Sequence, residues 1–204
     1  MRSGREAIVK AAIRIFAENG FAGASTREIC RSAGVTRPVL YYHFRGKEHL
    51  YQELMIDCFG KYQKLMLGAL QARGTLRERL VRMVTADFSL TKEDPVRTKF
   101  VLRMIFSPGD QHPLFDYIAE MEKERRWIAS VLQEGIDGGT LCGNARELAT
   151  NLMGMQVIAT LEYLLTGRST LTRRRAAQCV DLLLQGCAAR QDVFTDRYRK
   201  RMNL

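Results

Sequence analysis

The stretch over residues 25–47, which reads STREICRSAGVTRPVLYYHFRGK, constrains the fold most because it predicts two short helices joined by a tight turn. Ser25 and Glu28 have the spacing of a capping box, in which a hydroxyl and a carboxylate bond the free N–H groups at a helix start. Gly34 supplies the left-handed conformation that ends a helix and turns the chain. Pro38 lies in the first turn of the next helix, where the missing N–H costs nothing.

A further helix, over residues 5–19, is expected to pack against this pair, since its apolar residues form one helical face and Gly20 stops it. Thr36 is expected to cap the second helix of the pair. The residues expected to face inward and lock the helices together are Ile29, Ala33, Val35, Leu40 and Phe44. The residues left to face outward are Arg27, Arg37, Val39, Tyr42 and His43.

The remaining sequence predicts more helices and no strand. Apolar residues follow the helical period in successive segments, which are separated by glycine, proline and capping signals, such as the cap expected from Asn144 and Glu147. These predicted helices span residues 47–72, 76–90, 96–106, 113–137, 144–166 and 172–189. Together with the first three they predict an all-α protein of about nine helices, followed by a basic tail at residues 197–201.

Basic residues are in excess and are concentrated near the start of the chain. Lys and Arg number 32 against 22 Asp and Glu, which gives a formal net charge of +10. The first fifty residues hold nine Lys or Arg and four Asp or Glu, a net of +5, so half of the excess lies in a quarter of the chain. This balance favours an anionic partner, such as nucleic acid or a membrane surface, bound by the N-terminal segment.

Neither disulfides nor a membrane anchor is indicated. The five cysteines are odd in number and include no CxxC pair, so we expect reduced packing residues, with a redox switch as the less favoured alternative. Charged residues interrupt the N-terminus, which therefore lacks the apolar core of a secretory signal. The most apolar window, residues 152–165, is interrupted by Gln156 and Glu162 and is shorter than the roughly 20 residues of a membrane span. The sequence therefore predicts a cytoplasmic protein.

The two short helices have the layout of a helix-turn-helix, in which the second helix reads base edges in the major groove with its N-terminal residues. Arg37 can donate two hydrogen bonds to a guanine, while Pro38 and Val39 can touch a thymine methyl. Arg27 is expected at a phosphate or a base. The groups expected at phosphates are the side chains of Thr26, Tyr42, His43 and Lys47.

A helical bundle that binds nothing is the alternative interpretation of this segment. Short helices with paired tyrosines also occur in cores, and Tyr41 is expected to be half-buried because it follows the inward Leu40. The combination of a cap, a glycine turn, a proline in the first turn, aromatic residues and local positive charge favours DNA binding instead.

The segment over residues 5–54, and especially GVTRPVLYYHFRGKEHL, resembles the DNA-binding domain of TetR-family transcriptional regulators. The shared pattern is a glycine turn, an aromatic-rich recognition helix that ends in Tyr-Tyr-His-Phe, and a Lys-Glu-x-Leu start to the following helix. By this resemblance the DNA-contacting positions are Thr26, Arg27, Arg37, Pro38, Val39, Tyr41, Tyr42, His43 and Lys47.

The resemblance also implies the domain organisation. It implies a three-helix DNA-binding domain over residues 1–47 and a larger helical domain over residues 48–204 that binds a ligand and forms a homodimer. The eighth and ninth helices would form a four-helix interface with a second subunit, although each apolar face can equally be internal core. The apolar residues in question are Ala149, Leu152, Met153, Ile158, Leu161, Val180, Leu183, Leu184 and Cys187.

Aromatic and sulfur-containing residues in the fifth to eighth helices suggest an apolar ligand site, because flat rings and adaptable methionines suit such a pocket. The candidates are Phe88, Phe100, Met104, Trp127, Met155 and Tyr163. Arg103 and Glu162 are added because a charge within an apolar helix needs a partner or a ligand. Ordinary core packing is the alternative for the first group, and exposure at a helix edge for the two charges.

The favoured interpretation is a dimeric repressor that a small apolar or amphipathic molecule releases from a double-stranded DNA operator. A DNA-binding regulator without such a ligand is the alternative. No HExxH motif, histidine cluster of metal spacing or nucleophile motif occurs, so neither catalysis, a metal nor a cofactor is expected. A basic module that docks to membranes or to a protein through the tail at residues 197–201 is less favoured, since such runs are usually solvated ends.

Overall fold

The structure is a computed structural model that describes residues 4–106, 113 and 115–186. This part of the chain contains nine α-helices and no β-strand, which confirms the predicted all-α fold. The helices are α1 (Gly4–Gly23), α2 (Thr26–Ala33), α3 (Arg37–His43), α4 (Lys47–Gln71), α5 (Leu76–Glu93), α6 (Pro95–Phe106), α7 (Tyr117–Asp137), α8 (Ala145–Thr166) and α9 (Arg173–Gly186). Cys187 and the basic tail at residues 197–201 lie outside the described residues.

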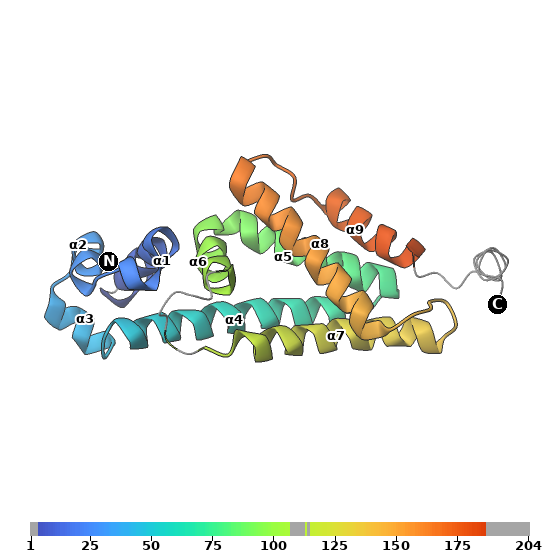
Figure 1. Ribbon diagram of the computed structural model, residues 1–204, viewed down its shortest axis with the longest axis horizontal. Helices are drawn as coiled ribbons and strands as arrows, with labels where there is room; N and C mark the ends of the chain where they lie inside the picture. Colours follow the sequence, from blue (N-terminus) through green and yellow to red (C-terminus); the bar gives the residue numbers. More distant parts are fainter. Residues whose placement is uncertain (1–3, 107–112, 114, 187–204) are drawn as a thin grey trace, which may run out of the picture.

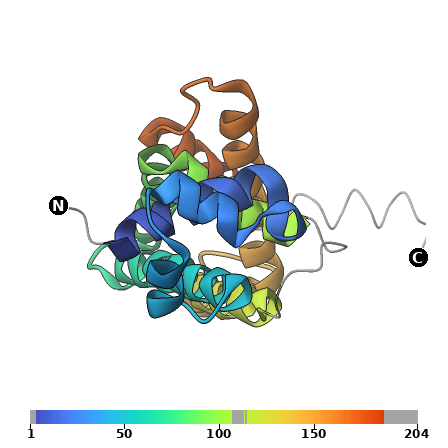
Figure 2. The ribbon, with the colours of Figure 1, turned by 90° about the vertical axis from the view of Figure 1, so that its left-hand side faces the viewer.

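The helices form a small group and a larger group that share one long helix. Figure 1 shows α1, α2 and α3 gathered at one end of the molecule and α5, α7, α8 and α9 towards the other. α4 runs from α3 along the lower side and joins the two groups, while α6 packs against α1 at the junction. Seen from the small group's end, α1 to α3 lie in front, with α9 above and α4 below (Figure 2).

The first hydrophobic core lies between α1, α2, α3 and the start of α4, and two residues of α6 complete it. Phe100 and Met104 are only 1% and 2% exposed in this core. The ring centroid of Phe100 lies 5.9 Å from that of Phe16 and 5.3 Å from that of Tyr51. Of the residues predicted to face inward, three are buried and two are partly buried: Ile29, Leu40 and Phe44, then Ala33 and Val35. The domain boundary at residue 47 stays a prediction. α6 follows that boundary in the sequence but packs against helices that precede it.

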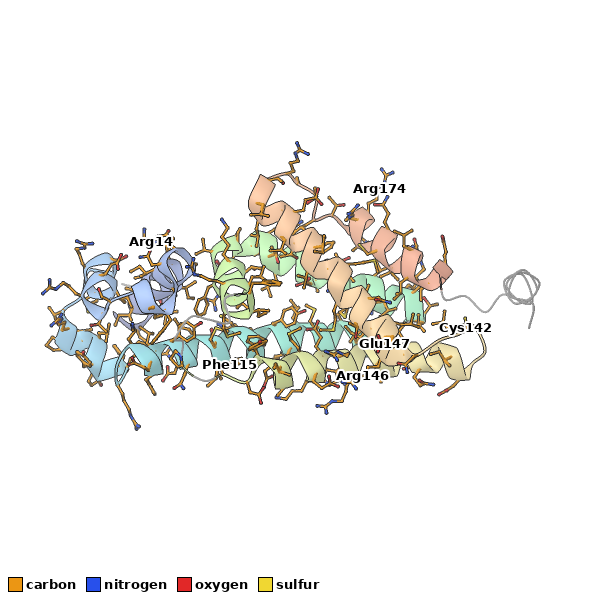
Figure 3. The ribbon with its side chains drawn as sticks, viewed as in Figure 1. Arg14, Phe115, Cys142, Arg146, Glu147 and Arg174 are labelled. Atoms are coloured by element: carbon orange, nitrogen blue, oxygen red, sulfur yellow. The ribbon has the colours of Figure 1, made fainter. Side chains whose placement is uncertain are left out.

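The second core lies between α4, α5, α7, α8 and α9, and side chains from these helices fill the space between the ribbons (Figure 3). Four of the apolar residues predicted to meet a second subunit are buried inside it: Ala149, Leu152, Val180 and Leu183. For these four the predicted dimer contact is wrong, because a side chain buried within its own subunit has no surface left for another. Ile158, by contrast, is 65% exposed.

Capping side chains fix the starts of α5 and α8. Thr75 Oγ1 accepts a hydrogen bond from the backbone N–H of Glu78 at 3.2 Å, and Glu78 Oε2 accepts one from the N–H of Thr75 at 2.9 Å. This complete capping box was not predicted from the sequence. At α8 the predicted cap is confirmed, since the Asn144 side chain accepts from two backbone N–H groups of the first turn, at 2.9 and 3.1 Å.

Three helix ends differ from the prediction by three or more residues, and one of them is that of α5, which runs to Glu93 rather than to Leu90. α7 begins at Tyr117 rather than at Pro113, because the Asp116 side chain caps it by accepting a hydrogen bond from a first-turn N–H at 2.9 Å. Gly20 has the expected positive φ of 71°, with ψ at 179°, but it forms a kink within α1 and helical residues continue beyond it.

Replacing Phe100 by alanine should destabilise the group formed by α1, α2 and α3, because the Phe100 ring projects from α6 into the centre of the first core. A buried Phe→Ala change costs about 3–5 kcal/mol, so we expect a clear fall in the urea unfolding midpoint. Phe106→Ala is the matched control on the same helix, since Phe106 is 57% exposed, and it should change the midpoint little. Equal effects of the two changes would contradict the placement of α6 in this core.

Candidate functional site

The turn between α2 and α3 has the geometry that the sequence predicts. Gly34 adopts φ 66° and ψ 31°, and its N–H points back to the carbonyl oxygens of Cys30 and Arg31. Ser25 Oγ accepts a hydrogen bond from the N–H of Glu28 at 3.2 Å. The second half of the predicted capping box is not formed, because the Glu28 carboxylate accepts a bond from α1 instead. α2 and α3 are therefore a helix-turn-helix with a fixed turn.

One face of α3 is open to solvent. Leu40 is fully buried and anchors the helix, whereas Tyr42 is 84% exposed and Arg37 and Pro38 are exposed. Tyr41 is 53% exposed, which agrees with the expectation that it is half-buried. The exposed face thus offers a guanidinium, a proline ring and two phenols to a partner, and the first two lie at the N-terminal end of the helix, where a recognition helix reads bases.

Val39 and His43 are less open than the sequence predicts. Both are partly buried, and a Cβ placed on Gly4 of α1 would lie 3.2 Å from Val39 Cγ1. The His43 ring lies 5.0 Å from the Tyr42 ring in an edge-on arrangement. Val39 therefore faces α1 on one side, and its contact with a thymine methyl stays a prediction.

Lys47, at the start of α4, has a structural role that the sequence did not reveal. Its ammonium donates hydrogen bonds to the carbonyl oxygens of Phe21 and Ala24 at 3.0 and 3.1 Å and lies 4.1 Å from the centre of the Phe21 ring. These contacts hold the connection between α1 and α2. An ammonium has three hydrogens to donate, so one is left for a phosphate.

Thr26 and Arg27 complete the predicted set at the start of α2, where Thr26 is partly buried and Arg27 is exposed. Thr36 precedes α3 without making the predicted side-chain cap. All nine predicted DNA-contacting residues thus lie on α2, α3 and the first residue of α4, at one end of the molecule (Figure 1). Their roles at bases or phosphates remain predictions.

The residues predicted to line a ligand site do not form one group. Phe88 is buried in the second core, and three others pack against it partly buried: Trp127, Met155 and Tyr163. Phe100 and Met104 belong to the first core instead. Arg103 lies at the junction, where its Nη1 donates to the carbonyl oxygen of Glu18 at 3.1 Å, and Glu162 is partly buried on α8.

A polar cluster that sequence reasoning missed lies inside the second core. Tyr62 Oη donates a hydrogen bond to Glu124 Oε1 at 2.6 Å, and Gln156 Nε2 donates one to Asp87 Oδ2 at 3.2 Å. Glu124 and Gln156 are only 8% and 3% exposed, while Tyr62 and Asp87 are partly buried. The four residues come from α7, α8, α4 and α5. The one signal in the sequence was Gln156, which with Glu162 interrupts the apolar stretch over residues 152–165.

Burial controls the protonation of this polar cluster. Burial raises the pKa of Asp87 from 3.8 to about 6, although the hydrogen bond from Gln156 opposes the shift. Burial also raises the pKa of Glu124 from 4.5 to about 7, against the hydrogen bond from Tyr62 and with the help of the negative charge of Asp87. The pKa of Tyr62 is raised as well, by burial and by the charges of both carboxylates. The two acids therefore titrate near neutral pH.

Comparison with known proteins identifies the helix-turn-helix unit. Residues 8–54 match the family model described as "Bacterial regulatory proteins, tetR family". The helix-turn-helix unit is therefore a TetR-type DNA-binding unit. The repressor KstR2 of Mycolicibacterium smegmatis is 28% identical over 144 residues, which cover 68% of this chain and 67% of that protein. The regulator YdgC of Bacillus subtilis is 29% identical over 192 residues, covering 89% and 91%.

Solved structures agree with this family. A putative transcriptional regulator from Pseudomonas aeruginosa PAO1 superposes with a TM-score of 0.72 at 26% identity, covering 89% of this chain and 88% of that one. The regulator KstR2 of Mycobacterium tuberculosis gives a TM-score of 0.76 at 21% identity, covering 93% and 97%, and this likeness shows the fold alone. This chain is thus a DNA-binding transcriptional regulator, as the sequence predicted.

Two absences concern the part of the chain that the structure describes. In residues 4–106, 113 and 115–186, no group of three or more His, Cys, Asp or Glu side chains is placed to hold a metal ion. No helix within the same ranges is long and apolar enough to cross a membrane.

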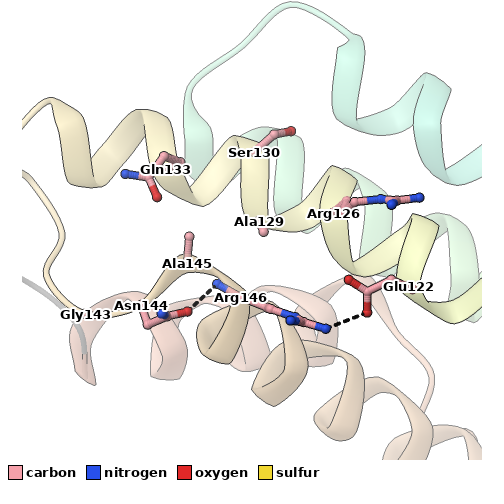
Figure 4. A pocket seen from close by; sticks show the side chains of 9 residues that line it. All are labelled: Glu122, Arg126, Ala129, Ser130, Gln133, Gly143, Asn144, Ala145 and Arg146. Carbon is pink, nitrogen blue, oxygen red and sulfur yellow. Dashed lines mark hydrogen bonds and ion pairs between the residues drawn. The ribbon is translucent and has the colours of Figure 1, made fainter.

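A surface groove of about 470 Å³ lies between α7 and the start of α8, and two of its three charged side chains, Glu122 and Arg146, pair with each other. Figure 4 shows Arg146 reaching Glu122 across the groove, at 3.0 Å, while Asn144 caps α8 beside them. Glu122 also pairs with Arg125 at 3.1 Å. Mutual pairing and an occupied cap leave this groove little to attract a ligand, so the buried polar cluster is the stronger interior candidate.

The raised pKa values predict that stability falls as pH rises. The folded chain keeps protons on Glu124 up to about pH 7, whereas the ordinary pKa is 4.5, so the folded state binds more protons in that window and loses stability through it. Glu124→Gln keeps an acceptor for Tyr62 without the charge. We expect it to raise stability at pH 8 by on the order of 2 kcal/mol and to flatten the dependence between pH 5 and 8.

The measurement is the urea unfolding midpoint at several pH values. Glu122→Gln, the same change on the same helix but in the surface groove, should retain the slope of the parent. A parent midpoint that rises from pH 5 to pH 8, or an unchanged slope in Glu124→Gln, would contradict the assignment.

Proposed function

We propose that this chain is a dimeric transcriptional repressor whose hold on its operator is released by a small molecule bound in the helical domain. The observation that carries the DNA-binding part is the open face of α3, which is held by a buried Leu40 and follows a fixed glycine turn. The match over residues 8–54 supports the same assignment. The relative KstR2 is named a repressor, which supports the direction of control.

In this proposal the exposed residues of α3 divide the work. Arg37, at the first position of α3, donates to the O6 and N7 atoms of a guanine, and Pro38 touches an adjacent thymine methyl. Tyr42, at 84% exposure, donates to a phosphate, as does the remaining hydrogen of the Lys47 ammonium. Arg27 adds a contact from α2. Base contacts then select the sequence while phosphate contacts fix the register.

Exposed apolar residues support dimerisation through α8 and α9. Ile158, Leu165 and Leu182 are 65%, 81% and 68% exposed. Large apolar side chains in that number on two adjacent helices favour a contact with the same surface of a second copy. A symmetric pair would present two α3 helices to successive major grooves, which lie about 34–36 Å apart on DNA.

Two contacts support a ligand response. α6 takes part in the first core through Phe100 and is bonded to α1 through Arg103, while the second core is built on α4, α5, α7, α8 and α9. A molecule that binds the second core in one arrangement better than in another shifts the spacing of the two α3 helices. KstR2 of Mycobacterium tuberculosis, whose solved structure is similar, is named a ketosteroid transcriptional regulator, which favours a ligand with a large apolar part. Regulation without a small molecule is the alternative.

Arg37→Ala should weaken binding to the cognate operator roughly tenfold or more while affecting unrelated DNA little, because a bidentate arginine–guanine contact contributes about 1–3 kcal/mol to discrimination. Tyr42→Phe, which removes only a phenolic hydroxyl, should weaken both kinds of DNA alike. The measurement is a gel-shift titration at a fixed salt concentration, with the DNA that flanks the gene encoding this protein.

Arg126→Ala removes the same charge from an exposed position on α7 and should leave operator binding unchanged. Lys47 is unsuitable for this comparison because its loss also frees the connection between α1 and α2. The base-reading role of Arg37 is wrong if its loss weakens all DNA equally, and the proposed function is wrong if the parent shows no salt-sensitive, sequence-selective binding.

Ile158→Glu should convert the dimer to a monomer, because it places a charge at the proposed contact between subunits. Ile56→Glu is the matched control, since Ile56 on α4 is 63% exposed and lies outside that surface. Sedimentation velocity measures both. A parent that sediments as a monomer, or an equal loss of dimer in the two variants, would remove the proposed interface.

A further inference from the structure

The polar cluster of Tyr62, Asp87, Glu124 and Gln156 carries one more inference, which rests on the proposed ligand response. Its members come from four different helices and meet inside the second core. Two carboxyl groups in such a place are costly, because burial disfavours the charged form of each and their like charges repel. The cost calls for a compensating partner.

The polar cluster has more acceptors than donors. With both acids ionised, the two carboxylates and the amide of Gln156 provide five oxygen atoms that can accept hydrogen bonds, while only the hydroxyl of Tyr62 and the NH₂ group of Gln156 can donate. The hydroxyl donates to Glu124 and one N–H of the NH₂ group donates to Asp87, which leaves a single N–H. Gln156 Oε1 is buried and has no hydrogen-bond partner. A buried acceptor without a donor is unfavourable, so the cluster is short of N–H or O–H groups.

The described part of the chain supplies no cation to this place. Some half-buried acids elsewhere do have one, as Asp57 has in Arg97 at 3.1 Å. Among the described residues, no Lys, Arg or His forms an ion pair with Asp87 or Glu124. A group that compensates the two carboxylates is therefore both positively charged and a donor of hydrogen bonds.

Apolar residues adjoin the polar cluster along the same helices. Phe88 follows Asp87 on α5 and is buried, and Trp127 lies one turn from Glu124 on α7. Both pack in the second core, as does Met155, the neighbour of Gln156 on α8. A molecule whose charged end meets the carboxylates would thus have its body among rings and a thioether.

We propose that this polar cluster binds the head of a small amphipathic organic cation, an ammonium or guanidinium group that donates to Glu124, Asp87 and Gln156 Oε1. The apolar body of the cation lies among Phe88, Trp127 and Met155. The ligand class is therefore cationic, and neutral or anionic molecules with the same apolar body bind less well. Neutralising both carboxylates removes this preference.

The test is a thermal-shift and calorimetric titration of the full chain with octylammonium and with proflavine, a flat aromatic cation. Octan-1-ol and octanoate are the comparisons, since they share the chain of octylammonium but not its charge. At least one cation should raise the melting temperature more than both comparisons do. Binding should be roughly tenfold weaker at pH 5.5 than at pH 8, because the carboxyl groups must lose their protons first. Proton release should therefore accompany binding at pH 6.

Asp87→Asn and Glu124→Gln keep the size of each side chain and should each weaken binding of the cation at least tenfold. Glu122→Gln, on the same helix as Glu124 but in the surface groove, should bind like the parent. Operator binding by the two cluster variants shows that they are folded. The proposal is overturned if neither cation binds or if octanol or octanoate binds as tightly as the cations do. It is also overturned if the double variant Asp87→Asn/Glu124→Gln binds cations as tightly as the parent does.

Gel shifts separate this inference from the proposed function. Release of the operator by octanoate or octanol, but not by a cation, would leave the ligand response intact and refute the cationic ligand. Cation binding that leaves the operator bound would support the polar cluster as a site and refute release by its ligand.

Discussion

The packing of α6 against α1 and α4 is the constraint on which the rest of the structure depends. Phe100 fills the aromatic centre of the first core against Phe16 and Tyr51. Arg103, nearly one turn further along α6, is bonded to the end of α1. At the start of α6, Arg97 bonds Asp57 of α4 at 3.1 Å. α6 thus joins α1 to α4, and α4 continues into the second core through Met66 and Leu70.

The sequence was sufficient for features that depend on neighbouring residues. The glycine turn at Gly34, the cap at Asn144 and the inward face at Leu40 all come from interactions within a few residues, and all are present. The order and approximate limits of the helices follow from the same kind of signal. The limits were wrong where an unnoticed side chain supplied a cap, as Asp116 does for α7.

Features that depend on distant residues could not be predicted. Lys47 reads as a surface cation beside a recognition helix, but its ammonium bonds carbonyl oxygens 26 and 23 residues away. Phe100 reads as a pocket residue because α6 is apolar, yet its partners lie on α1 and α4. In the polar cluster, the two hydrogen-bonded pairs are separated in the sequence by 62 positions and by 69 positions. Periodicity shows that a side chain faces inward but not which distant helix it meets.

α4 links the two sites in one rigid element. At its first residue Lys47 fixes the connection between α1 and α2, and some four turns later Tyr62 donates to Glu124 in the polar cluster. These positions are separated by roughly 20 Å along a continuous helix, which transmits a displacement better than a loop does. In the proposed function, a ligand that engages Glu124 bonds the carboxylate that Tyr62 also bonds, so the cluster is connected directly to α4. The ligand can alter DNA binding only if it binds more tightly to one arrangement of α4 than to another.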